Sequence, residues 1–133
     1  MAECKPCVTP MEERLKLTKA NTAAKVDATL YQSIVGGLCY LAHMRPDIAF
    51  AVGYVSRFME DPREDHWAAV KRLLRYVKGT VDQGIVFSKT GGSGLQITVF
   101  NDADMAGDVD GRRSTSGVLI FLGSAPISWL SLK

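Results

Sequence analysis

The sequence contains no stretch that is both long and apolar enough to cross a membrane. Two long uncharged runs occur, at 28–44 and 114–132, but the first includes Gln, Ser, Gly and His and the second includes hydroxyl residues, Gly and Pro. A spanning helix needs about 20 predominantly apolar residues, so we interpret both runs as buried elements and expect no membrane contact. The N-terminus also lacks the apolar core of a signal peptide.

Cysteine is scarce, and its scarcity bears on compartment and metal binding. Three cysteines cannot all pair within one chain, which favours a reducing intracellular compartment, cytoplasmic or nuclear. Cys4 and Cys7 have the spacing of half a zinc site, but the remaining candidates, Cys39, His43 and His66, offer no second close pair. We therefore interpret Cys4 and Cys7 as two reduced thiols.

The chain has little net charge, because 16 basic residues face 14 acidic ones and leave +2. This balance excludes a strong overall field for nucleic acid or membranes. With 47% hydrophobic and 23% charged residues the composition is that of a globular protein rather than a disordered one. Residues 1–80 carry 12 basic and 9 acidic side chains, whereas residues 81–133 carry 4 and 5. Function must therefore come from local patterns.

The hydrophobic periodicity predicts an α+β fold, with a three-helix unit followed by a small, mainly antiparallel sheet. We divide the chain into an extended arm (1–26), a helical unit (27–82) and a β unit (83–133). In the β unit, period-2 patterns predict strands at 85–87, 95–99, 118–122 and 127–130, with turns at 91–94 and 123–124.

Each predicted helix has an apolar stripe and a recognisable boundary residue. Asp27 is expected to cap the first helix, Pro46 to begin the second, and Asp61 with Pro62 to open the third. Gly79 is expected to end the third helix in a left-handed conformation. The stripes expected to be buried are Leu30, Ile34, Leu38 and Leu41; Ile48, Val52, Val55 and Phe58; and Trp67, Val70, Leu74 and Val77.

A basic stripe lies on the third predicted helix. Lys71, Arg75 and Lys78 recur at spacings of four and three, with Arg72 beside them, so the four side chains share a face turned away from the apolar stripe. Such a stripe is either a solvated helix surface or a surface that tracks phosphates. The spacing leaves both interpretations open.

Four aspartates lie within nine residues after the strand at 95–99: Asp102, Asp104, Asp108 and Asp110. A helix-loop-helix calcium site does not fit, because Ala106 and Arg113 occupy the fifth and twelfth positions counted from Asp102. The alternatives are a solvated acidic turn or a weak magnesium site for phosphodiester chemistry, with Asp102 and Asp104 as ligands.

Several long strings of residues resemble the Ty1/copia class of retrotransposon Pol polyprotein. They run in order along the chain: 31–41 (YQSIVGGLCYL), 45–52 (RPDIAFAV), 55–59 (VSRFM), 66–80 (HWAAVKRLLRYVKGT), 102–104 with 107–108, 112–117 (RRSTSG) and 127–129 (ISW). The resemblance implies that residues 27–80 correspond to the thumb and connection of reverse transcriptase. It implies that residues 95–133 correspond to the opening three strands of a truncated ribonuclease H fold.

The same resemblance implies an incomplete catalytic set. Asp102 matches the first catalytic aspartate of ribonuclease H, whereas the next acidic residues of the family lie beyond Lys133. The metal-binding aspartates of the polymerase lie upstream of this segment. We therefore expect Asp102 to be vestigial, the chain not to be an enzyme, and no cofactor beyond weakly bound magnesium.

Two functional hypotheses follow. The first is a retrotransposon-derived, non-catalytic protein that binds a nucleic-acid backbone, duplex or RNA–DNA hybrid, through Lys71, Arg72, Arg75 and Lys78, or binds a protein. The second is a nuclease fragment that cleaves RNA–DNA hybrids with magnesium once a partner completes it. We also expect a homodimer through the β unit, because the middle strand is apolar on both faces and the helices can cover one side only.

Overall fold

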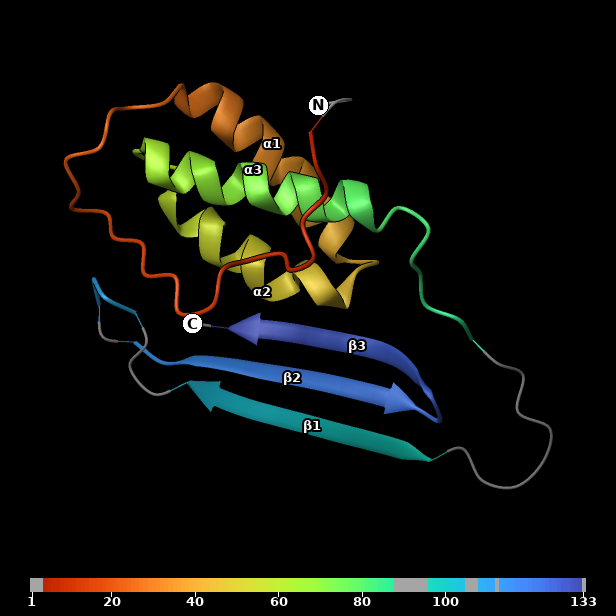
Figure 1. Cartoon of the computed structure of the whole chain (residues 1–133). Coiled ribbons are helices and arrows are strands. Elements are labelled where there is room, and N and C mark those ends of the chain that lie inside the picture. The colour runs from red at the N-terminus through yellow and green to blue at the C-terminus, as the bar shows by residue number, and fades with distance from the viewer. Residues whose placement is uncertain (1–3, 88–95, 105–107, 112, 133) are drawn as a thin grey trace.

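Helices form one layer and a sheet forms the other in the computed structural model, which describes residues 4–87, 96–104, 108–111 and 113–132 (Figure 1). Within these residues the helices are α1 (Ala28–Ala42), α2 (Pro46–Val55), the short 3-10 helix η1 (Ser56–Phe58) and α3 (Glu64–Gly79). The strands are β1 (Ile97–Asp104), β2 (Thr115–Leu122) and β3 (Ala125–Leu132), paired antiparallel in the order β1-β2-β3. The α+β prediction is confirmed. None of the described helices is long and apolar enough to span a membrane.

Helix α1 begins where predicted but buries a different face. The Asp27 carboxylate accepts hydrogen bonds from the backbone N–H groups of Thr29 and Leu30, as expected of an N-cap. The buried residues are Tyr31, Val35 and Leu38, whereas Leu30 is 47% exposed, so the predicted stripe is wrong by one position at its start. The inner position goes to Tyr31 because its hydroxyl donates a hydrogen bond to the Val55 carbonyl, 2.8 Å away.

Helix α2 follows its prediction closely. Pro46 is its first residue, and Ile48, Val52, Val55 and Phe58 are all buried. These side chains form the centre of a core that is otherwise supplied by α1, α3 and the arm. The prediction for this element is confirmed.

Helix α3 begins two residues later than predicted, at Glu64. The N-cap is Arg63, whose backbone N–H donates to Nδ1 of His66, while Asp61 pairs with the side chains of Arg63 and Lys25. The buried face of α3 consists of His66, Ala69, Val70, Leu73 and Tyr76. Of the predicted stripe, only Val70 belongs to this face, whereas Trp67, Leu74 and Val77 are partly buried. The rotation arises because the buried imidazole anchors the first turn.

Gly79 does not stop α3 in a left-handed conformation. Among the described glycines only Gly123 has a positive φ, and Thr80 caps α3 with φ −130°. A Cβ added to Gly79 would lie 2.8 Å from the Cβ of Pro6. The glycine therefore permits the arm to pass close to the end of α3.

The sheet differs from its prediction at its start. Residues 85–87 form no strand, and Val86 and Phe87 are exposed, because nothing in the described chain pairs with this run. The turn at 123–124 is confirmed, with Gly123 at φ +62° joining β2 to β3. The turn predicted at 91–94 lies outside the described residues. β1 is longer than predicted and runs on to Asp104.

Candidate functional site

Asp102 lies on β1 beside a groove between α2 and the helix-facing side of the sheet. The groove has a volume of about 580 Å³, and Phe50 of α2 and Phe100 and Trp129 of the sheet contribute aromatic rings to its lining. The indole N–H of Trp129 donates to the Ala42 carbonyl at 2.8 Å, which fixes the position of that ring. Asp102 is exposed, and its carboxylate accepts a hydrogen bond from the N–H of Ala103 at 2.8 Å.

Two of the other aspartates of the acidic loop contact residues far away in the sequence. Asp104 ends β1, and its side chain lies outside what the structure describes. Asp108 is buried, lies 3.9 Å from the Arg57 guanidinium and accepts the N–H of Gly111. Asp110 accepts hydrogen bonds from the Thr18 hydroxyl and, at 2.9 Å, from the N–H of Lys19. Asp108 and Asp110 thus attach the loop to η1 and the arm.

Among the described residues, no three His, Cys, Asp or Glu side chains come together in a group able to bind an ion. Cys7 and Cys39 are free thiols. Of the predicted magnesium ligands, only Asp102 has a side chain that the structure describes.

The arm crosses α3 (Figure 1), and its first residues contact the basic stripe of that helix. The Arg72 guanidinium donates to the Glu12 carboxylate at 3.1 Å and to the Thr9 hydroxyl at 2.9 Å. The Lys78 ammonium donates to the carbonyl of Cys4 at 3.0 Å. The arm is also tied to the backbone of Arg75, whose carbonyl accepts the N–H of Cys7 at 3.4 Å. Lys71 is exposed. We call Lys71, Arg72, Arg75 and Lys78 the cationic face.

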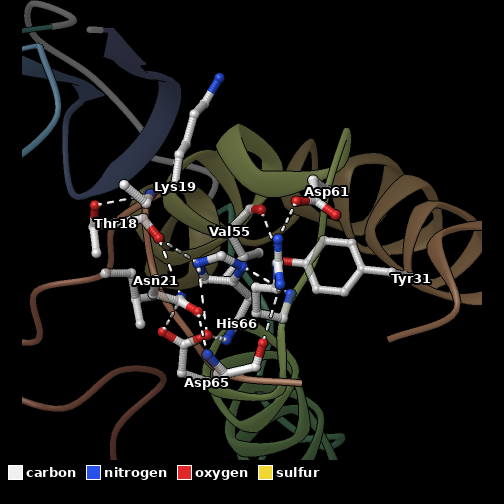
Figure 2. Close-up of polar contacts among 12 residues, drawn as sticks. Thr18, Lys19, Asn21, Tyr31, Val55, Asp61, Asp65 and His66 are labelled. Atoms are coloured by element: carbon white, nitrogen blue, oxygen red, sulfur yellow. Dashed lines mark hydrogen bonds and ion pairs between the residues drawn. The ribbon is translucent and has the colours of Figure 1, made fainter. Parts of the chain in front are cut away.

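A second part of the arm is anchored in the core (Figure 2). The carbonyl of Thr18 lies 3.0 Å from Nε2 of His66. Because Nδ1 of His66 accepts the N–H of Arg63, Nε2 is the ring nitrogen that donates to the Thr18 carbonyl. The imidazole is fully buried and stacks on Phe58 with ring centroids 4.0 Å apart. Nearby, Leu17 is buried and its N–H donates to the hydroxyl of Tyr54.

A polar network joins α2 to the end of α3. The Arg45 guanidinium, largely buried, forms a two-point contact with Asp47 at 2.9 and 2.6 Å and donates to Thr80. The Tyr76 hydroxyl donates to Asp47 at 2.8 Å. The hydrogen bonds from Arg45 hold the pKa of Asp47 below its usual value, and the bond to Asp47 raises the pKa of Arg45. Burial, and then the hydrogen bond to Asp47, raise the pKa of Tyr76.

Among the residues that the structure describes, the outer face of the sheet, turned away from the helices, carries no charged side chain. Residues alternate between faces along a strand, and Phe100, Leu119 and Trp129, which pair across the strands, line the groove on the helix side. The outer face therefore consists of Ile97, Val99, Asn101 and Ala103 on β1; Ser116, Val118, Ile120 and Leu122 on β2; and Ala125, Ser128, Leu130 and Leu132 on β3. Val99 and Leu130 remain 57% and 51% exposed.

Several residues that organise these surfaces were not predicted as functional from the sequence. Arg57 lies on η1, stacks over the Tyr54 ring at 5.0 Å and donates to Thr115. Glu12 and His66 contact partners 60 and 48 residues away. No local spacing signals such contacts. The "RPD" string at 45–47 was visible as a motif, but its role in a buried ion pair was not.

Comparison with known proteins identifies the family. The chain is homologous over its whole length to Ty1/copia-type retrotransposon Pol polyproteins, and it belongs to the family of proteins that share this Pol segment. It is 47% identical over 133 residues to the retrovirus-related Pol polyprotein from transposon RE2 of Arabidopsis thaliana, and 44% identical over 138 aligned positions to that from transposon TNT 1-94 of Nicotiana tabacum. The two alignments include 100% and 98% of this chain. They span only 9% and 10% of the length of the two polyproteins.

A shorter relative shares most of its length with the chain. Secreted RxLR effector protein 161 of Plasmopara viticola is 46% identical over 104 residues, which cover 77% of this chain and 72% of that protein. No family model matches the chain. No solved structure matches it either.

Proposed function

We propose that the chain is a non-catalytic binding protein of retrotransposon origin, with residues 27–80 corresponding to the thumb and connection of reverse transcriptase and the sheet to the opening strands of ribonuclease H. Asp108 and Asp110 are already engaged by Arg57 and the arm. Two-metal phosphodiester cleavage needs several converging carboxylates. The engagement of these two carboxylates supports a binding role over the alternative, magnesium-dependent cleavage of RNA–DNA hybrids.

The principal ligand proposed is the phosphate backbone of a duplex or an RNA–DNA hybrid, bound by the cationic face. The observation that carries this proposal is that two of its four side chains already hold oxygen acceptors. Arg72 and Lys78 donate to a carboxylate, a hydroxyl and a carbonyl at 2.9 to 3.1 Å. Phosphate oxygens accept hydrogen bonds from guanidinium and ammonium groups with similar geometry. Such contacts carry no base preference.

The test is the affinity of the whole chain for a labelled 20-base-pair RNA–DNA hybrid, measured by fluorescence anisotropy over a range of salt. Three or four phosphate contacts predict that log affinity falls against log salt with a slope of about −2 to −4. Lys71→Glu should weaken binding several-fold, because Lys71 is exposed on the cationic face. Lys16→Glu, the same charge change at an exposed arm position, is the control. Equal binding by the two variants would exclude the cationic face as the site.

A second binding surface is the outer face of the sheet, and we propose a second copy of the chain as its occupant. Three strands about 4.8 Å apart, each with eight residues rising about 3.3 Å, give a face of roughly 14 by 26 Å, on the order of 400 Å² per copy. A stable dimer buries about 800 Å² per partner. A face without charge can pair with itself about a two-fold axis, and its size predicts a weak, concentration-dependent homodimer.

Sedimentation equilibrium at tens of micromolar tests this pairing. Val99→Lys together with Leu130→Lys should leave a monomer, because a charge buried between two apolar faces is costly. Both side chains are more than half exposed in the single chain, so its fold should tolerate the change. Val86→Lys, at an apolar residue that is 77% exposed outside the sheet, should leave the dimer intact. A wild-type chain that stays monomeric would refute the proposal.

An intracellular location, cytoplasmic or nuclear, remains part of the proposal. Its support is that Cys7 and Cys39 are free thiols in the fold. Thiols persist in reducing compartments and tend to be oxidised outside them.

A further inference from the structure

The arm makes contacts with the cationic face that resemble those of a phosphate backbone. Between residues 4 and 12 it presents the Glu12 carboxylate, the Thr9 hydroxyl and the Cys4 carbonyl to Arg72 and Lys78. Each of these is an oxygen acceptor, and one is an anion. A nucleic-acid strand on the cationic face would need the same donors, so the arm and the ligand cannot use them together.

The fit of the arm on the cationic face is incomplete. The Nε groups of Arg72 and Arg75 are buried without a hydrogen-bond partner among the described residues. Beside them, a cavity of about 250 Å³ lies between the arm and α3, lined by Met11, Glu12 and Leu15 as well as by both arginines. A buried donor without a partner has lost its hydrogen bonds to water and gained none in return, which destabilises the closed arrangement. The closed arrangement therefore leaves donors that an incoming phosphate oxygen can satisfy.

The arm also has a bend between its two differently held parts. The bend lies at Arg14, whose φ of 56° is the one positive φ among the described residues other than glycine. After the bend, Leu17 is buried and Thr18 is bound to His66, so this part is anchored in the core. Before it, Glu12 is 61% exposed at its side chain and its ion pair with Arg72 lies at the surface. Because surface ion pairs contribute little to stability, the first part of the arm is the easier one to detach.

We propose that residues 4–12 are a built-in competitor of nucleic acid, which occupies the cationic face and leaves it, by bending at Arg14, when a phosphate backbone binds. This inference rests on the proposed binding of nucleic acid by the cationic face. It explains why a chain with a clustered set of basic side chains carries acceptors for them within its own first residues. Affinity for nucleic acid is accordingly limited by the arm as well as by the small net charge.

The test compares two neighbouring acids in the whole chain. Glu12→Gln removes the carboxylate that holds Arg72, whereas Glu13→Gln makes the same change in net charge at an exposed residue for which no such contact exists among the described residues. With the same labelled RNA–DNA hybrid at about 0.1 M salt, Glu12→Gln should bind 3- to 10-fold more tightly than Glu13→Gln. Its salt slope should steepen by about one, because Arg72 becomes available for a phosphate.

A variant that leaves net charge unchanged provides a second measurement. Thr9→Ala removes the hydroxyl that accepts from Arg72 and should tighten binding about twofold. The arm is no competitor if Glu12→Gln and Glu13→Gln bind equally and Thr9→Ala binds like the wild type. If Lys71→Glu still weakens binding in that case, the cationic face nevertheless binds nucleic acid. If Lys71→Glu binds like Lys16→Glu, the proposed function and this inference both fail.

Discussion

Replacing Tyr31 with Phe isolates one buried hydrogen bond between α1 and the end of α2. The Tyr31 hydroxyl donates to the Val55 carbonyl at 2.8 Å, and both residues are fully buried. Its loss removes a net contribution of about 1 kcal/mol and leaves a buried carbonyl with one partner fewer. We expect Tyr31→Phe to lower the free energy of unfolding by about 1–2 kcal/mol without changing the denaturant slope.

Urea unfolding followed by the fluorescence of Trp67, whose ring centroid lies 6.2 Å from that of Tyr31, measures the change. Tyr40→Phe deletes the same oxygen from a side chain that is 79% exposed and should shift the free energy by less than about 0.3 kcal/mol. If the two variants are equally stable, the hydrogen bond contributes nothing and the reasoning is wrong.

The ionisation of Tyr31 allows the same two proteins to be compared by their stability at alkaline pH. Burial, and then the charge of Asp65, raise the pKa of Tyr31 far above its ordinary value of 10.0. In the unfolded chain this phenol ionises near pH 10, whereas in the folded chain it stays neutral. Its contribution is therefore present below about pH 10 and lost as pH rises further. Tyr31→Phe should show a shallower loss of stability above pH 10 than the wild type.

Three other predictions concern the arm, the ion pair and catalysis. Gly79→Ala should push Pro6 away and speed cleavage after Glu12 and Glu13 by a glutamate-specific protease, whereas Gly84→Ala, with nothing within 4 Å of its new Cβ, should not; equal rates would contradict the close approach. Because the pKa of Asp47 is lowered by Arg45, its stabilising effect is present above about pH 4 and lost as pH falls through the folded value. Asp47→Asn should thus lower Tm at pH 7 and flatten the decline of Tm toward pH 3. Pure protein with Mg²⁺ or Mn²⁺ should not cleave an RNA–DNA hybrid, and turnover abolished by Asp102→Asn would restore the enzyme hypothesis.

Local signals in the sequence predicted those parts of the fold that depend on neighbours in the chain. Asp27 caps α1 with N–H groups two and three residues away, and Pro46 opens α2 with its fixed φ. The rotation of α1 and α3 could not be predicted in this way, because Leu30 and Tyr31 are both apolar enough to face the core. The choice depends on the carbonyl of Val55, 24 residues away.

For the candidate surfaces, too, the sequence indicates the local pattern but not the long-range contacts. The spacing of Lys71, Arg72, Arg75 and Lys78 assigns them to one face of α3, but it could not show that residues 4–12 contact Arg72, Arg75 and Lys78. Mixed charge and two prolines suggested only an extended arm. Its contacts with α3 are long-range, and no periodicity encodes them.

The edges of the sheet determine how far association can proceed. Pairing of β1 in one copy with β3 in the next is a head-to-tail contact, which does not close and would build a fibre. Pro126 lacks an N–H on the β3 edge, the ladder shifts register between Ile120 and Phe121, and Asp102 places a charge on the β1 edge. Such features blunt strand edges. The sheet therefore discourages open-ended growth along its edges and leaves its outer face for the proposed contact, which would close after two copies.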